Sequence, residues 1–150
     1  NCIIETRRFC PDWWGTAEPI VITTFNRDEN TKSGKIKNIR FRNITCKGEN
    51  GVLIHGTEEN MIEDVTFENV SVTMTKTSKW DCGLYDLRPC LQYGVEKYKN
   101  SGFFIRNAKN VLIEKSSVQW DNICDDYNKA IDSENALNLE LIRFKGVDAN

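Results

Sequence analysis

The side chains best suited to chemistry lie in two long segments with weak strand character, residues 5–17 and 73–100. Trp13 and Trp14 are adjacent in the first segment, and an indole face can stack on the apolar C–H face of a sugar ring. Cations in both segments can pair with the carboxylates of an acidic sugar, and arginine offers two parallel donors; these cations are Arg7, Arg8, Lys79 and Arg88. Long loops often build a binding face, so the sequence predicts a surface for an acidic polysaccharide or oligosaccharide. The alternative is structural: tryptophans covering the flank of the fold, and cations balancing Glu5, Asp81 and Asp86.

No set of residues in the chain matches a catalytic or metal-binding pattern. Asp125 and Asp126 are adjacent carboxylates, but such pairs in a polar loop usually face water. His55 is the one histidine, and no two cysteines form a C-x-x-C pair, so a zinc-finger ligand set is missing. We therefore predict no catalytic residue, no metal and no cofactor within these 150 residues.

Six cysteines are spread along the chain. Cys82 and Cys90 lie in one loop-like stretch and could form a disulfide if the chain is secreted. Alternatively, cysteines such as Cys2 and Cys46 are small buried apolar residues. The expected location is outside the cytoplasm, either secreted or periplasmic.

Length and charge exclude several classes of protein. The 150 residues suffice for one domain, with 20 basic and 22 acidic side chains and a net charge of −2. A basic footprint for nucleic acid is missing, and no stretch approaches the roughly 18 apolar residues of a membrane span. We expect neither nucleic acid nor membrane as a partner.

Four segments fit one template, apolar-x-Asn-apolar-x-apolar. Each alternates with a period of two and is rich in Val, Ile and Phe, which predicts strands rather than helices. Spacings in the twenties indicate stacked repeats, in which each strand pairs with its counterpart in the next repeat. The segments are Ile36 to Phe41, Ile62 to Phe67, Ala108 to Ile113 and Ala136 to Leu141.

The repeats predict an all-β fold, a parallel β-helix of four to five coils forming a single partial domain over residues 1–150. The repeated Asn suits a turn, where stacked amides can hydrogen-bond along the axis; this also explains the two sequons that begin at Asn43 and Asn69. One continuous core is expected to contain Ile39, Phe41, Val65, Phe67, Val111, Ile113, Leu139 and Leu141. An ordinary β-sandwich is the alternative.

The chain is expected to begin within a coil, because Asn1 to Ile4 matches Asn43 to Cys46. We therefore expect a fragment of a longer helix, with Ile3 and Ile20 as uncovered core side chains of the first coil. Unpaired strand edges recruit other strands, which predicts self-association, or pairing with a complementing N-terminal chain.

The strand phrases, the block from Asp12 to Ile20 and the phrase from Tyr85 to Pro89 resemble glycoside hydrolase family 28, the polygalacturonase-like enzymes of pectin breakdown. The resemblance covers nearly the whole chain and is closest to the C-terminal half of a bacterial member. It implies a right-handed parallel β-helix and inverting hydrolysis of galacturonide bonds, with carboxyl groups roughly 6.5–9.5 Å apart. It also adds Glu18 to the expected substrate-binding residues Trp13, Trp14, Arg88, Lys79 and Arg7.

The catalytic phrases of that family, Asn-Thr-Asp and Asp-Asp, have no secure match in this chain. In the best alignment, Leu53 and His55 stand where the family has a substrate-binding Arg and Lys, so His55 is expected only to end a strand. The chain alone is thus expected to be inactive. The alternative is a non-catalytic carbohydrate-binding or structural β-helix; a third reading, a β-helix lyase, lacks the carboxylate cluster that holds Ca²⁺.

Overall fold

A computed structural model gives the fold, and it describes residues 1–11 and 14–149. Within these ranges the chain forms ten strands and no helix, so none of the described residues belong to a helix that could cross a membrane. Eight strands belong to one sheet and two to a separate hairpin. The strands are β1 (Cys2–Glu5), β2 (Val21–Thr23), β3 (Lys37–Gly48), β4 (Val52–His55), β5 (Ile62–Thr75), β6 (Leu84–Asp86), β7 (Val95–Lys97), β8 (Phe103–Glu114), β9 (Ser117–Asn122) and β10 (Ile131–Ile142).

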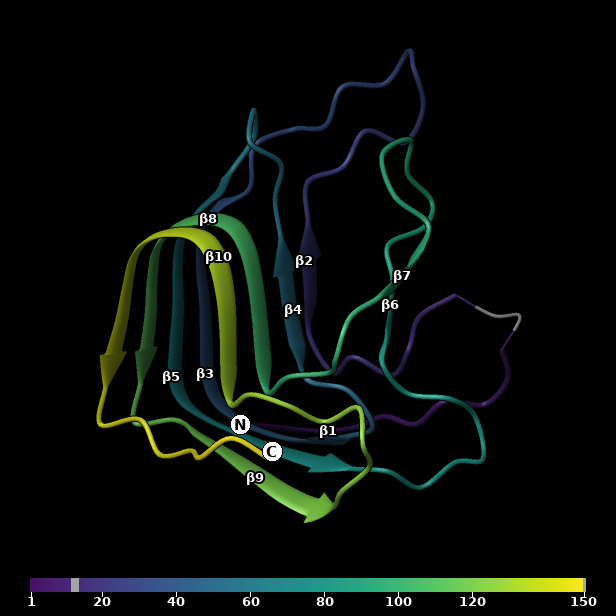
Figure 1. The fold of residues 1–150 in the computed structure, drawn as a ribbon. Helices are drawn as coiled ribbons and strands as arrows, with labels where there is room; N and C mark the ends of the chain where they lie inside the picture. The colour runs from purple at the N-terminus through teal and green to yellow at the C-terminus, as the bar shows by residue number, and fades with distance from the viewer. Residues whose placement is uncertain (12–13, 150) are drawn as a thin grey trace.

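All pairings in the large sheet are parallel, and the sheet curves strongly because its long strands bend (Figure 1). Three sides result. Side A contains the first part of β3 and β5, with the later parts of β8 and β10. Side B contains β1, the later parts of β3 and β5, and β9, whereas side C contains β2, β4 and the first parts of β8 and β10.

The four template segments stack on side A in the predicted register. Ile39 pairs with Val65, Val65 with Val111, and Val111 with Leu139. This parallel stacking confirms the sequence prediction, including strand rather than helix at Ala136 to Leu141. It contradicts a conventional antiparallel sandwich.

The bends in the long strands occur at residues with a left-handed backbone, mostly asparagines. Asn is the non-glycine residue that tolerates this conformation best, and Asn43 and Asn69 both have a φ of 55°. The expected hydrogen bonds between stacked amides are present. In each of them, an asparagine Nδ2 donates to a side-chain oxygen on the neighbouring strand. The donor and acceptor pairs are Asn69 and Asn43 (2.8 Å), Asn110 and Asp64 (2.9 Å), Asn138 and Asn110 (2.9 Å), and Asn135 and Asn107 (2.7 Å).

The core lies inside the curve of the sheet and contains seven of the eight predicted residues. Val65, Phe67, Val111 and Ile113 are fully buried, and Ile39, Phe41 and Leu139 pack against them, partly exposed. The prediction for Leu141 is wrong, since its side chain is 46% exposed. Leu141 pairs with Ile113 on one side, and no described strand covers the other.

Ile3 and Ile20, expected to be uncovered core side chains, both differ from that expectation. Ile20 is buried in the core rather than uncovered. Ile3 is exposed, but it pairs with exposed Thr45 and points outward, while Ile4 pairs with buried Cys46 and faces the core. Cys46 is therefore a buried apolar residue as expected, whereas Cys2 is exposed.

Residues 73–100, expected to form a loop, contain strand residues. β5 continues to Thr75, and β6 and β7 form an antiparallel hairpin beside the large sheet (Figure 1). Tyr85 and Leu87 of this segment pack with Leu53 and Phe104 on the outer face of side C, in a second small core. The position that the family resemblance assigns to a substrate-binding arginine, Leu53, is thus covered.

Candidate ligand-binding groove

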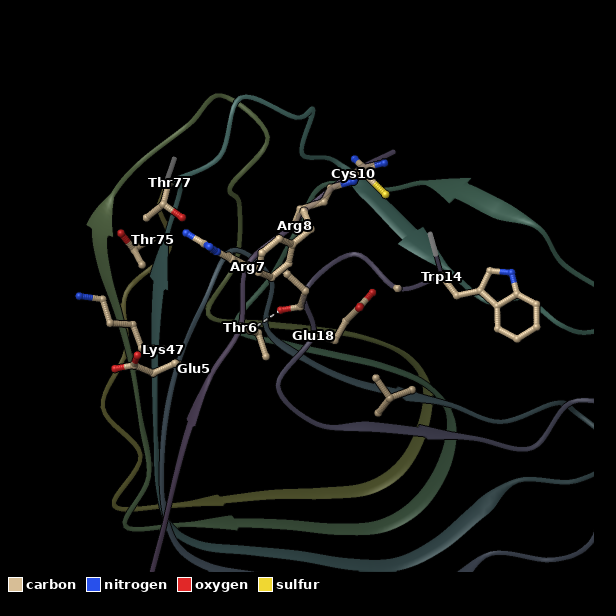
Figure 2. Close-up of a pocket in the computed structure, with 14 residues that line it drawn as sticks. Glu5, Thr6, Arg7, Arg8, Cys10, Trp14, Glu18, Lys47, Thr75 and Thr77 are labelled. Carbon is tan, nitrogen blue, oxygen red and sulfur yellow. Dashed lines mark hydrogen bonds between the residues drawn. The ribbon is translucent and has the colours of Figure 1, made fainter. Parts of the chain in front are cut away.

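A groove of about 850 Å³ lies where the chain leaves β1 and returns to β2. Figure 2 shows Lys47 and Thr75 on one side of the groove, Trp14 on the other, and Arg7 between them. The lining residues come from β1, the 6–20 segment, β2, β3, the end of β5 and the 76–83 segment that follows it; they are Glu5, Thr6, Arg7, Arg8, Phe9, Cys10, Trp14, Gly15, Ala17, Glu18, Val21, Lys47, Thr75 and Thr77.

The lining combines positive charge with exposed aromatic rings. Arg7, Arg8 and Lys47 contribute three cations, in a chain whose net charge is −2. The Phe9 and Trp14 side chains are 73% and 62% exposed, and the Arg7 guanidinium lies 4.4 Å from the centre of the Phe9 ring. Lys47 reaches Asp121 at 3.6 Å, but both side chains are largely exposed, so the pair is weak. Cations beside aromatic faces suit a ligand that is both anionic and a sugar.

Hydrogen bonds close the base of the 6–17 segment. The Thr6 N–H donates to the Lys47 carbonyl at 2.9 Å, continuing the pairing of β1 with β3 by one residue. The Thr6 hydroxyl donates to the Ala17 carbonyl at 2.7 Å. These bonds hold the two ends of the segment together, so Arg7 and Trp14 project from a closed loop.

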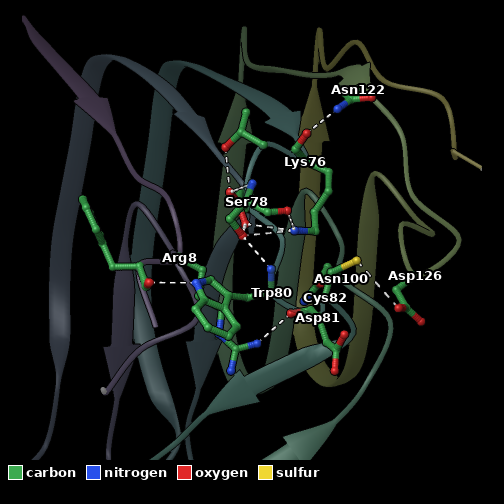
Figure 3. Close-up of polar contacts among 12 residues, drawn as sticks. Arg8, Lys76, Ser78, Trp80, Asp81, Cys82, Asn100, Asn122 and Asp126 are labelled. Atoms are coloured by element: carbon green, nitrogen blue, oxygen red, sulfur yellow. Dashed lines mark hydrogen bonds and ion pairs between the residues drawn. The ribbon is translucent and has the colours of Figure 1, made fainter. Parts of the chain in front are cut away.

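Two further hydrogen bonds join this segment to residues 76–83, as Figure 3 shows. Arg8 Nη1 donates to the Asp81 carbonyl at 2.6 Å, and Trp80 Nε1 donates to the Phe9 carbonyl at 2.7 Å. Arg8, one of the cations expected to pair with a ligand, thus helps Trp80 to hold one wall of the groove in place.

Glu49 holds the start of the 76–83 segment in place through hydrogen bonds. Its carboxylate accepts hydrogen bonds from the Thr77 hydroxyl (2.6 Å), the Ser78 N–H (2.6 Å) and the Ser78 hydroxyl (2.8 Å). Lys76 Nζ lies 3.5 Å from Glu49 Oε2. Burial by itself would raise the pKa of this carboxyl, but the hydrogen bonds and Lys76 together lower it, so Glu49 stays ionised.

The pKa of Glu18 shifts in the opposite direction to that of Glu49. Burial raises its pKa, and the nearby charge of Asp86 adds to the effect. The Thr16 N–H donates to Oε2 at 2.8 Å, and the Thr16 hydroxyl contacts Oε1. Thr16 Oγ1 also reaches the Leu84 carbonyl at 3.1 Å, so a protonated Glu18 can donate to Thr16 while Thr16 donates to Leu84.

Asp86 fixes the turn that follows Trp14. Its Oδ2 accepts a hydrogen bond from the Gly15 N–H at 2.9 Å. Its two oxygens also form a bidentate pair with Arg88, both at 2.9 Å. These hydrogen bonds lower the pKa of Asp86 against the effect of burial, so a charged side chain of the β6–β7 hairpin positions the turn beside the groove.

The structure brings together three of the residues predicted to bind substrate. Arg7, Trp14 and Glu18 line the groove. Arg88 pairs with Asp86 instead, and Lys79 lies over the ring of its neighbour Trp80 at 4.8 Å; neither lines the groove. Trp13 lies outside the described residues.

Sequence reasoning missed Lys47, Phe9 and Val21. Lys47 pairs with Glu5 in the β1–β3 register, which places it beside the loop that follows Glu5. The match between Asn1–Ile4 and Asn43–Cys46 contains that register, so extending it by one residue would have placed Lys47. No comparable pattern marks Phe9 or Val21.

The other candidates lie elsewhere. His55 ends β4, as expected; it is buried between the rings of Phe25 (5.0 Å) and Tyr93 (5.1 Å), and burial lowers its pKa. Asp125 is exposed, and Asp126 Oδ2 lies 3.7 Å from the Cys82 thiol. None of these three lines the groove.

The arrangement is suited to holding an anionic ligand. No group of three or more His, Cys, Asp or Glu side chains able to hold a metal ion occurs in the part of the chain that the structure describes. Comparisons with protein-family models, with curated proteins and with solved structures find no match to this chain.

Proposed function

We propose that the groove binds an acidic polysaccharide or oligosaccharide of the galacturonate type. The observation that carries this proposal is the convergence of Arg7, Lys47, Trp14 and Phe9 on one groove. The carboxylate of each uronic acid can pair with a guanidinium or ammonium group, and the ring can stack on an exposed aromatic face. Two carboxyl groups, Glu5 and Glu18, also line the groove, and burial raises the pKa of Glu18.

We further propose that the fold is a right-handed parallel β-helix, as the resemblance to glycoside hydrolase family 28 implies. Three observations support this: the parallel pairing on all three sides, the bends at asparagines, and the stacked amides along the axis. A ligand groove beside one side of a coil is a natural place for a long polysaccharide to lie.

The proposed activity is participation in inverting hydrolysis of pectic polysaccharide. Such hydrolysis needs a general acid and a carboxylate that activates water. The family's aspartate phrases have no secure match in this chain, so we assign these 150 residues the role of holding substrate. A non-catalytic carbohydrate-binding protein is the second candidate, because the groove requires only binding.

Calorimetric titration of the purified chain with oligogalacturonate and with an uncharged galactose oligomer of equal length tests the proposed binding. We expect saturable binding of the acidic oligomer, weakened by salt because ion pairs between exposed groups are screened, and at least tenfold weaker binding of the neutral one. Equal affinity for the two would refute the proposal. A reducing-end assay on polygalacturonate separates the candidates: we expect no release by this chain alone.

A further inference from the structure

The half-buried cysteines Cys82 and Cys124 belong to segments that pack against each other, although 41 residues separate them in the chain. Cys82 Sγ lies 3.7 Å from Oδ2 of Asp126, two residues after Cys124, and the neighbouring Cys124 thiol is one of the groups that raise the pKa of Cys82. Cys82 follows the segment that carries Trp80, and Cys124 follows β9 on side B. The pair expected from the sequence, Cys82 with Cys90, does not form: Cys90 Sγ contacts the Tyr93 carbonyl at 3.2 Å and packs in the second small core.

The backbone around the two thiols is held in place independently of them. Asn100 donates from its N–H to the Asp126 carbonyl at 2.8 Å, and its Oδ1 accepts from the Gly83 N–H at 2.7 Å. Gly83 has a φ of 75°, and a Cβ there would lie 2.8 Å from Asp126 Cγ. A left-handed glycine is therefore required for this close approach, which brings residues 82–83 against residues 124–126.

We propose that Cys82 and Cys124 are the site of an intrachain disulfide. The bond would join the 76–83 segment, which forms one wall of the groove, to the turn after β9. Figure 3 shows the Cys82 sulfur directed toward Asp126. The inference is independent of the ligand that the groove binds.

The oxidation proceeds by exchange with a low-molecular-weight disulfide such as oxidised glutathione. The Cys124 thiolate attacks one glutathione sulfur, which forms a mixed disulfide and releases the first glutathione thiolate. The Cys82 thiol then loses its proton to the buffer, and the Cys82 sulfur attacks the Cys124 sulfur. The second glutathione leaves as a thiolate, so two cysteines are oxidised while one glutathione disulfide is reduced to two thiols.

The order of attack follows from burial. Burial and the neighbouring thiol raise the pKa of Cys82 to about 12. Since the thiolate is the nucleophile, Cys82 is suited to the second, intramolecular step, in which the attacked sulfur is already held beside it. Cys2 is exposed, whereas its neighbour Cys46 is fully buried, so Cys2 is expected to stop at the mixed disulfide.

Peptide mapping of the full chain tests the proposal. The reduced protein is incubated in a buffer of oxidised and reduced glutathione, its free thiols are alkylated, and the unreduced digest is read by mass spectrometry. We expect a cross-linked peptide containing Cys82 and Cys124, which persists in Cys90→Ser and is lost in Cys124→Ser. The oxidised wild type should melt about 10 °C higher than the reduced form, because the bond restricts the unfolded chain.

Two results would overturn the proposal without relying on any variant. One is a cross-link between Cys82 and Cys90 in the wild type. The other is full alkylation of Cys82 and Cys124 in samples whose Cys2 carries glutathione, since that modification shows that the oxidant was active.

Discussion

The Asn69 amide donates a hydrogen bond to the Asn43 side-chain oxygen at 2.8 Å, and both residues have a φ of 55°. The same residue type therefore serves two purposes at this corner. It tolerates the left-handed backbone that bends each strand from side A to side B, and it joins neighbouring strands along the stack.

Substitution of Asn69 by Ala and by Gly separates these two purposes. Both variants lose the hydrogen bond to Asn43, but only Ala also strains the left-handed backbone. We expect Asn69→Ala to be less stable than Asn69→Gly by about 1 kcal/mol, measured by urea denaturation. At Thr45, an exposed strand residue that pairs with Ser71, the order should reverse, with Ala more stable than Gly. The same order at both sites would contradict this account of the corner.

The core can be tested at Phe67. This side chain is fully buried, stacks on Phe41 with ring centres 4.9 Å apart and meets Phe103 edge to face at 5.3 Å. Phe67→Ala should reduce the free energy of unfolding by about 3–5 kcal/mol. Leu137→Ala is the matched control, since Leu137 is 50% exposed; it should cost less than about 1 kcal/mol. A small effect at Phe67 would show that side A does not enclose a single core.

Glu18 should make stability depend on pH. Burial raises its pKa in the folded chain above the ordinary value of 4.5, so the folded state holds the proton more tightly than the unfolded state. The contribution of Glu18 to the free energy of unfolding is therefore greatest at low pH, and it is lost as pH rises through the pKa of Glu18 in the folded chain. Glu18→Gln mimics the protonated form, and it should gain stability relative to wild type as pH rises from about 4 to 8.

Denaturation curves across this pH range provide the measurement, with Glu59→Gln as the control at an exposed carboxyl. Glu49, whose pKa is lowered, has the opposite dependence, but it is present in every variant and cancels in the comparison. A constant difference between Glu18→Gln and wild type at all pH values would contradict burial of an ionisable Glu18.

Much of the fold was predictable because the repeat itself encodes it. The template at Ile39, Val65, Val111 and Leu139 contains both the alternation that marks a strand and the register that aligns the strands. The hairpin of β6 and β7 was missed, because its short strands belong to no repeat and are held by contacts of Tyr85 and Leu87 with distant strands. Leu141 fits the template as well as Ile113, but β10 pairs only with β8 among the described strands, and the template does not encode this difference.

The groove was predictable only in part. Aromatic and cationic composition identified Arg7 and Trp14, which line it, but could not tell them from Arg88 and Lys79, which do not. Asp86 lies two residues from Arg88, so their bidentate pairing needs only a local turn, and composition carries no information on that turn. Lys47 became part of the groove through the pairing of β1 with β3.

The most direct test of the central claim, that the groove recognises the carboxylates of an acidic sugar, is a titration of wild type and Arg7→Ala with oligogalacturonate and with its methyl ester. The ester keeps the sugar rings and removes the charge. We predict that Arg7→Ala weakens binding of the acid about tenfold, or about 1.4 kcal/mol, and leaves the weaker binding of the ester unchanged. Trp14→Ala, which removes ring stacking, should weaken both ligands alike. An equal loss for acid and ester in Arg7→Ala would contradict the account.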